Sequence, residues 1–238
     1  VVAATALSGS LPAAELAAAQ AFCDSLGVRQ LTPATHEIER EGYRANAGDR
    51  CYFCKAELIE VLTPISAELG FAGVATGTNA DDATAGFRPG IKAAADRDAF
   101  TPLLDVGLTK AQIRAASRGW GLPTWDKPAA ACLSSRIAYG IEVTPARLSR
   151  VERAESGLRH LLSGRGIDVA NLRVRDLGDR GRIELDPAVV EALSADPAAA
   201  EAVVGVVQGA GFDDAFVDPV GFRSGAMNEL LADPARYR

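Results

Sequence analysis

The chain has 238 residues, a formal net charge of −6 and 48% hydrophobic residues, which excludes a disordered chain and a protein that coats nucleic acid nonspecifically. No run of about eighteen apolar residues occurs, so we expect no membrane-spanning helix. The first residues, Val1 to Thr5, carry no basic region typical of a signal peptide. Four cysteines in a chain of this size favour a reducing compartment, and we therefore expect a cytoplasmic protein.

Strand patterns alternate with helix patterns over the first half of the chain. Short apolar runs predict buried strands at residues 1–7, 28–31, 71–76 and 99–104. A helix is predicted after the first strand, with Pro12 in its first turn and Cys23 on its apolar face as a core thiol. Thr109 and Gln112 form a capping box for a later helix. This alternation predicts an α/β fold with a doubly wound, mostly parallel sheet.

A Cys-x-x-Cys pair opens another predicted helix. Cys51 and Cys54 lie between Arg50 and Lys55, at the start of an apolar-periodic segment. Two thiols at this spacing can share one metal, and the helix N-terminus with the two cations would favour thiolates. The pair alone leaves zinc, a redox pair, an iron–sulfur cluster and coincidence open.

Small and polar residues follow the third predicted strand. The loop reads Gly77-Thr78-Asn79-Ala80-Asp81-Asp82, at the carboxyl end of a strand, where open α/β sheets bind ligands. A turn from Phe87 to Lys92 then carries Arg88. For Arg88 and Lys92, a ligand-binding turn and a solvated surface turn are both open.

The segment from Trp125 to Gly140 gathers reactive groups. It places the thiol of Cys132, the hydroxyls of Ser134 and Ser135 and the cation of Arg136 within five residues, after a proline that discourages a continuous helix. Such a segment offers a sulfur nucleophile or metal ligand beside an anion-binding pair.

The composition changes after Gly140, which predicts a small second domain of the α+β class. Thr144 and Pro145 start a helix there. Residues 171–185 alternate as a hairpin whose polar face carries Arg173, Arg175, Arg182 and Glu184. That face is either solvated or suited to a phosphate. A helical stretch over 187–209 and a strand over 215–217 follow, and the closing motif Gly221 to Asn228 places Arg223 in an anion-binding type of turn.

Taken together, several separated motifs resemble one family, the LarE-type ATP-dependent sulfur transferases of nickel-pincer cofactor synthesis, which act in lactate racemase maturation. The motifs are the loop at 77–82, Arg88-Pro89-Gly90, the segment 125–140, the Arg-x-Arg strand at 173–175, Glu184 and the closing Gly-Phe-Arg-Ser-Gly-x-Met-Asn. The resemblance implies a nucleotide-binding α/β domain of the pyrophosphatase-loop (adenine nucleotide hydrolase-like) class over residues 1–140. It also implies an α+β substrate and sulfur-transfer domain over 141–238.

The resemblance implies an enzyme that adenylates a carboxylate of pyridinium-3,5-biscarboxylic acid mononucleotide with ATP and Mg²⁺ and then replaces oxygen by sulfur. In family members with three cysteines, a [4Fe–4S] cluster carries the sulfur as a bound sulfide. Cys51, Cys54 and Cys132 match that subtype and leave one iron open. In the alternative, Cys132 gives up its own sulfur and becomes dehydroalanine.

The resemblance also assigns roles to single residues. Cys132, Ser135 and Arg136 are the implied catalytic residues, and Arg173 and Arg175 would grip phosphate with Ser135 and Arg136. The remaining implied binding residues are Gly77, Thr78, Asn79, Asp82 and Arg88 on the nucleotide side, Glu155 and Glu184 for a metal ion or the substrate, and Arg223.

One motif of the family is missing. The family's Ser-Gly-Gly-x-Asp-Ser phosphate loop has no match, because Ser8-Gly9-Ser10 follows the family's second strand and not its first. We expect either a piece of a longer protein, as the absent initiator methionine favours, or a chain that has lost ATP activation. A tRNA thiolase and a noncatalytic metal-binding module are the rival hypotheses. The expected partner is the pyridinium mononucleotide, with no membrane or nucleic acid, and a homo-oligomer stays open.

Overall fold

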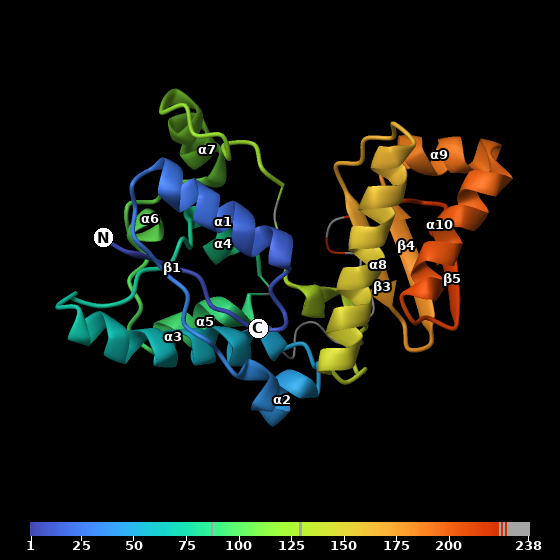
Figure 1. The fold of residues 1–238 in the computed structure, drawn as a ribbon. Helices are drawn as coiled ribbons and strands as arrows, with labels where there is room; N and C mark the ends of the chain where they lie inside the picture. The colour runs from blue at the N-terminus through green and yellow to red at the C-terminus, as the bar shows by residue number, and fades with distance from the viewer. Residues whose placement is uncertain (87, 129, 224, 226, 228–238) are drawn as a thin grey trace.

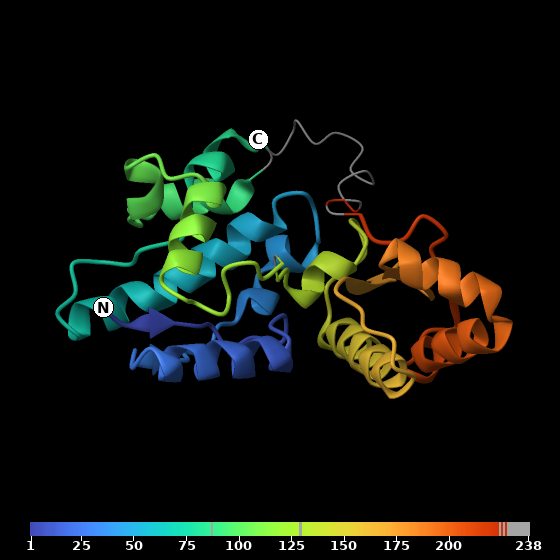
Figure 2. The same ribbon diagram turned by 90° about the horizontal axis from the view of Figure 1, so that it is seen from above.

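The computed structural model of the protein describes residues 1–86, 88–128, 130–223, 225 and 227. The chain forms two lobes side by side, one extending to Gly119 and the other from Pro145 to Val217 (Figure 1). The described residues between these lobes, 120–128 and 130–144, form the crossing segment, which runs from one lobe toward the other in both views (Figure 2).

The first lobe is mostly helical around short parallel strands. Strand β1 (Ala3–Ala4) pairs in parallel with β2 (Gln30–Leu31), and Ala75 makes a parallel bridge with Phe100. The helices of this lobe are α1 (Ala13–Ser25), the 3₁₀ helix η1 (Glu37–Glu39), α2 (Glu41–Arg44), α3 (Arg50–Glu68), α4 (Ala80–Thr84), α5 (Pro89–Ala95), α6 (Pro102–Asp105) and α7 (Lys110–Gly119). The α/β composition and the parallel pairing agree with the sequence-based prediction.

The predicted doubly wound, mostly parallel sheet is present only in pieces among the described residues. The β1–β2 pair and the Ala75–Phe100 bridge form separate pieces. Between them lies a groove of about 480 Å³, lined by β1, by residues 73–77 and by apolar side chains of α3. The strand predicted over 99–104 is wrong beyond Phe100, because Pro102 lies in the first turn of α6, where proline favours a helix start.

The second lobe packs helices against a three-stranded sheet in the order β3-β4-β5. Strands β3 (Leu172–Asp176) and β4 (Arg180–Leu185) are antiparallel, and β5 (Asp214–Val217) runs parallel to β4. The helices of this lobe are α8 (Pro145–Gly164), α9 (Pro187–Ala195) and α10 (Pro197–Gly209). The predicted hairpin is confirmed, with Leu172 opposite Leu185 and Val174 opposite Ile183.

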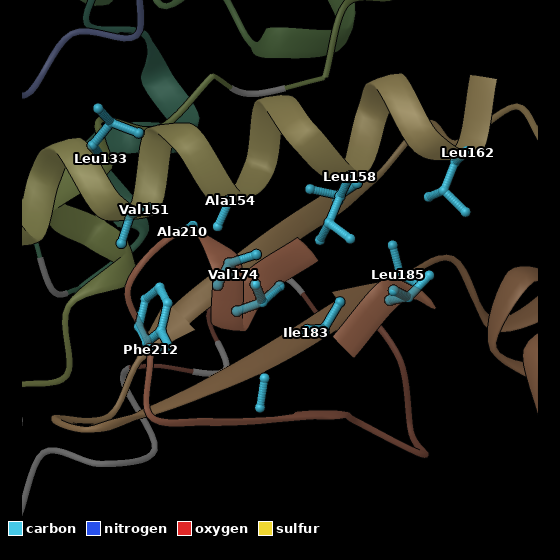
Figure 3. Close-up of a cluster of buried hydrophobic side chains, with 14 of the residues drawn as sticks. Leu133, Val151, Ala154, Leu158, Leu162, Val174, Ile183, Leu185, Ala210 and Phe212 are labelled. Carbon is cyan, nitrogen blue, oxygen red and sulfur yellow. The ribbon is translucent and has the colours of Figure 1, made fainter. Parts of the chain in front are cut away.

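The main hydrophobic core lies under α8. Figure 3 shows side chains of α8, among them Leu158, directed at the strand residues Val174 and Ile183, and all three side chains are fully buried. Burying a side chain of this size stabilises the fold by about 1.5–3 kcal/mol. Leu133 and Ile137 of the crossing segment belong to the same core, so the core fixes the chain next to Cys132.

Two predicted helix starts are confirmed. The Thr109 hydroxyl accepts a hydrogen bond from the Gln112 amide, and the Gln112 side chain accepts one from the Thr109 amide, which completes the capping box. The Thr144 side chain accepts from the Arg147 amide at the start of α8.

Across the described ranges, no helix combines the length and the apolar character that crossing a membrane requires.

Candidate functional site

A cavity of about 750 Å³ lies between the two lobes. The first lobe contributes Arg50, Cys51, Lys55, Thr76, Gly77, Thr78, Asp82 and Arg88 to its wall. The crossing segment contributes Ser135 and Tyr139, the second lobe contributes Arg173 and Arg175, and the chain after β5 contributes Phe222. Guanidinium and ammonium groups thus come from both lobes, and Asp82 is the one carboxylate among the described lining residues. The wall therefore favours an anionic ligand that spans both lobes.

The predicted nucleotide loop forms the first-lobe end of the cavity. The hydroxyls of Thr76 and Thr78 are 3.0 Å apart, on either side of Gly77. Asn79 caps α4, since its side chain accepts from the Asp82 amide at 3.3 Å and the Asp82 carboxylate accepts from the Asn79 amide at 3.2 Å. Arg88 lies 3.7 Å from the Asp82 carboxylate. The cap makes the loop conformation a local property of its own sequence.

The three candidate cysteines lie at the junction of α3 and the crossing segment. Cys51 and Cys54 occupy the first turns of α3, and Cys132 is the N-cap of the 3₁₀ helix η2 (Leu133–Arg136). Each is a free thiol, and Cys51 lines the cavity. The Arg50 side chain, next to Cys51, donates to the carbonyl oxygen of Ser134, two residues after Cys132, at 2.8 Å, so the two cysteine-bearing segments lie side by side.

Burial dominates the protonation of the Cys-x-x-Cys pair. It raises the pKa of the Cys54 thiol to about 12, with further increases from Cys132 and Glu37. Partial desolvation in the cavity wall likewise raises the pKa of Cys51, although this residue is exposed. Arg50 lowers the pKa of Cys51 and Lys55 lowers that of Cys54, in the direction expected of the two cations, but desolvation outweighs both effects.

The arrangement of the candidate ligands bears on whether they could hold a metal. Within the described ranges, no three His, Cys, Asp or Glu side chains converge on one point as the ligands of one metal ion. The Cys51, Cys54 and Cys132 thiols are grouped more loosely, on two segments. Iron–sulfur clusters are held by cysteine thiolates, and binding would deprotonate the thiols.

Arg136 is enclosed and does not line the cavity. It is 3% exposed, and its guanidinium donates to the two oxygens of Glu155 at 2.9 and 3.2 Å. It also donates to the carbonyl oxygen of Cys132 at 2.9 Å, as does the Ser135 hydroxyl at 2.7 Å. Glu155 accepts in addition from the Val174 amide at 3.0 Å. In this arrangement Arg136 and Glu155 fix the backbone around Cys132, and Ser135 lies in the cavity wall.

The polar face of the β3–β4 hairpin is directed at the cavity and not at solvent. Arg175 donates from Nε to Glu184 at 2.8 Å and from Nη1 to the Ser135 carbonyl at 3.2 Å. Arg182 lies 2.9 Å from Glu184 on the other side. Since Arg175 is 6% and Glu184 1% exposed, the solvated-face alternative is wrong for these two residues. Arg175 lines the cavity, and Glu184, which does not line it, holds the Arg175 guanidinium in place through the ion pair.

Arg173 is the second hairpin arginine in the wall. Its guanidinium lies 5.6 Å from the centre of the Phe222 ring. Burial and the neighbouring charge of Arg136 lower its pKa. A cation held in this way gains from a bound anion.

Several residues of the cavity wall, among them Lys55, Tyr139 and Phe222, were not predicted as ligand-binding residues. Lys55 follows the second cysteine and Phe222 precedes Arg223, so both lay within quoted motifs. Arg223 itself is exposed and is not among the lining residues. Phe87, Ala129, Ser224, Ala226 and Asn228, which belong to quoted motifs, lie outside the described residues.

The Ser8-Gly9-Ser10 turn lies apart from the cavity. The two serine hydroxyls are 2.8 Å apart, and Ser10 is buried and donates to Glu37 at 3.0 Å. Both hydroxyls thus have partners within the first lobe.

Comparison with known proteins gave three relatives, and no protein-family model matches. The chain is 40% identical over 230 residues to an uncharacterized protein of Synechocystis sp., covering 97% of this chain and 83% of that protein. It is 30% identical over 213 residues to the pyridinium-3,5-bisthiocarboxylic acid mononucleotide synthase of Lactiplantibacillus plantarum, covering 90% and 74%. An uncharacterized protein of Methanocaldococcus jannaschii is 28% identical over 141 residues, covering 59% and 52%.

Proposed function

The chain belongs to the family of the pyridinium-3,5-bisthiocarboxylic acid mononucleotide synthase, and from this premise we propose that it inserts sulfur into a carboxylate of pyridinium-3,5-biscarboxylic acid mononucleotide with the use of MgATP. The observation that carries the proposal is a single cavity with anion-binding groups from both lobes and a thiol in its wall. A nucleotide and a second phosphate-bearing molecule can meet there beside a source of sulfur.

In the first half-reaction, a substrate carboxylate oxygen attacks the α-phosphorus of ATP and pyrophosphate leaves. The acyl adenylate then carries AMP as a good leaving group in place of hydroxide. Thr78 and Arg88 lie where a hydroxyl and a guanidinium can hold nucleotide phosphates, and Asp82 can hold Mg²⁺ through a carboxylate oxygen. We therefore propose that the first lobe is a nucleotide-binding domain of the pyrophosphatase-loop class.

The second lobe offers the site for the mononucleotide phosphate. Arg173 and Arg175 project from one face of β3 into the cavity, next to Ser135. Two guanidinium groups and a hydroxyl can give a phosphate several charge-assisted hydrogen bonds. With the phosphate held there, the pyridinium ring and its carboxylates would extend toward Cys51 and the nucleotide loop.

The sulfur enters by attack on the acyl carbon, with AMP as the leaving group. Cys51, Cys54 and Cys132 would hold a [4Fe–4S] cluster, which would supply that sulfur when bound. Arg136, Glu155 and the Ser135 hydroxyl act on the protein side by fixing the Cys132 backbone.

The test is a reaction of the anaerobically reconstituted protein with the dicarboxylate mononucleotide, MgATP and sulfide. Formation of AMP and of the thiocarboxylate product, dependent on both substrates, supports the proposal. AMP release without any dependence on the mononucleotide would overturn it. Bound iron and acid-labile sulfide in the reconstituted protein test the cluster separately.

Sacrificial donation by Cys132 is decided by the mass of the protein after turnover. Conversion of Cys132 to dehydroalanine removes the side-chain sulfur and limits the reaction to one product per chain. An unchanged mass with several products per chain supports delivery from the cluster. The loss of sulfur from Cys132 at one product per chain would reassign that residue as the donor.

A further inference from the structure

Two buried polar residues next to the cysteines have no direct part in the proposed chemistry. Arg50, which precedes Cys51, is 4% exposed, and Asn46, four residues earlier in the turn before α3, is fully buried. We propose that the side chains of Arg50 and Asn46 form a clamp that sets the position of the Cys132 segment relative to Cys51 and Cys54. This inference rests on the proposed function, in which Cys51, Cys54 and Cys132 act together and therefore need fixed relative positions.

Arg50 links the two cysteine-bearing segments directly. Its Nη1 donates to the carbonyl oxygen of Ser134 at 2.8 Å, across a separation of 84 residues in the sequence. The same nitrogen donates to the side-chain oxygen of Asn46. The guanidinium also lies 5.9 Å from the centre of the Tyr139 ring. The cation is thus enclosed on several sides, and its orientation is fixed by these partners.

Asn46 extends the link along the crossing segment. Its Nδ2 lies within hydrogen-bond distance of three carbonyl oxygens, those of Ile137 at 3.2 Å, Ala138 at 2.8 Å and Ile141 at 2.9 Å. The backbone of Asn46 has φ 51°, in the left-handed region, where asparagine is among the tolerated residues. Its carbonyl accepts from the Gly140 amide at 3.1 Å.

Together these contacts define the place of Cys132 from one side, as Arg136 does from the other. Arg50 is one residue from Cys51, and Ser134 is two residues from Cys132, so the Arg50–Ser134 bond leaves little freedom between the two thiols. The Arg136 guanidinium holds the Cys132 carbonyl against the second lobe. Buried networks of this kind give a fixed geometry when every member is satisfied.

The first test measures amide hydrogen exchange over residues 133–143 in the reduced full chain. We expect Arg50→Gln and Asn46→Gly to speed exchange there by about tenfold, because the segment loses its anchors and opens locally. Glycine suits the left-handed backbone at position 46, so that variant removes the side chain without added strain. Arg44→Gln is the matched control, since the Arg44 side chain meets the same segment through an exposed pair with Glu142 at 3.5 Å, and the variant keeps the Arg44 carbonyl that accepts from the Val143 amide.

The second test asks whether the clamp acts through Cys132. The readout is iron retained per chain after reconstitution with iron and sulfide and a chelator challenge. We expect Arg50→Gln to lose iron about as fast as Cys132→Ala, and the double variant to lose it no faster than Cys132→Ala alone. Arg50→Lys, which keeps a donor and the charge, should lie between Arg50→Gln and the unchanged protein.

The outcomes separate the two proposals. Unchanged exchange over 133–143 in both clamp variants overturns the clamp, as does an equal further loss of iron when Arg50→Gln is added to Cys132→Ala. If the unchanged protein retains no iron, the cluster of the proposed function fails, and the exchange measurement still decides the clamp. A melting curve identifies a variant that has unfolded, and Asn46→Gly then replaces Arg50→Gln in the double variant.

Discussion

Arg175 and Glu184 form a buried ion pair across the β3–β4 hairpin, with Arg175 Nε and Nη2 at 2.8 and 2.7 Å from one carboxylate oxygen of Glu184. The pair has its guanidinium in the cavity wall and its carboxylate fully enclosed. Removing one partner of such a pair leaves an uncompensated buried charge.

We therefore expect Glu184→Ala to lower the free energy of unfolding by about 3 kcal/mol. The measurement is urea unfolding at neutral pH. Asp214→Ala is the control, because it breaks the exposed pair of Arg180 with Asp214 at 2.7 Å in the same sheet. That change should cost at most about 1 kcal/mol. An equal decrease in the free energy of unfolding in the two variants would show that the buried Arg175–Glu184 pair contributes no more to stability than a surface pair.

Arg173 is expected to act on binding more than on stability. Arg173→Lys keeps the charge but removes the planar fork that suits phosphate, so the mononucleotide should bind at least about tenfold more weakly. Isothermal titration with the dicarboxylate mononucleotide measures this. Arg180→Lys, on the neighbouring strand but outside the described cavity wall, is the control and should leave the affinity unchanged. An unaltered affinity in Arg173→Lys would remove Arg173 from the phosphate site.

Asn79 is expected to support nucleotide binding through its cap. Asn79→Ala removes the acceptor for the Asp81 and Asp82 amides and should destabilise the start of α4 by about 1 kcal/mol. Since that turn lies in the cavity wall, the affinity for MgATP should fall by about threefold or more. Thr109→Ala removes the equivalent cap of α7, and it should lower stability without changing MgATP affinity. A similar change of MgATP affinity in Asn79→Ala and Thr109→Ala would contradict a local role of the Asn79 cap in nucleotide binding.

The raised pKa of Cys54 predicts its reaction with an alkylating agent as a function of pH. In a reduced chain with Cys23, Cys51 and Cys132 changed to serine, burial remains and keeps the thiol protonated. The rate of Cys54 alkylation should therefore still rise at about pH 10, where an ordinary thiol has levelled off.

The same variant unfolded in urea is the control for this measurement. Burial raises the pKa of Cys54 in the folded chain above its value in the unfolded chain. The alkylation rate of the unfolded chain should therefore reach its plateau at a lower pH than that of the folded chain. Because the pKa of Cys54 is higher in the folded chain than in the unfolded chain, the protonated thiol contributes to the stability of the fold. This contribution is fully present below the unfolded-state pKa of Cys54 and is lost as the pH rises toward about 12. Coinciding plateaus in folded and unfolded chains would refute the shift.

Local features could be predicted from the sequence because their causes are local. The hairpin register follows from alternation over residues 171–185, and the starts of α7 and α8 follow from the hydroxyls of Thr109 and Thr144. The strand predicted over 99–104 failed for an equally local reason, since Pro102 begins a helix. The predicted parallel sheet is present only in pieces, because strand pairing joins residues far apart and no local pattern specifies which edges meet.

The sequence by itself determined the family of the chain, the α/β character of its first half, the hairpin of its second and the motifs that border the cavity. Only the tertiary structure decided that Arg136 and Glu184 are enclosed while Arg173 and Ser135 face the cavity. The reason is that burial depends on contacts such as that of Arg50 with Ser134, which spans 84 positions. Residue type and spacing show that a side chain can bind an anion, but packing determines whether it has already been paired.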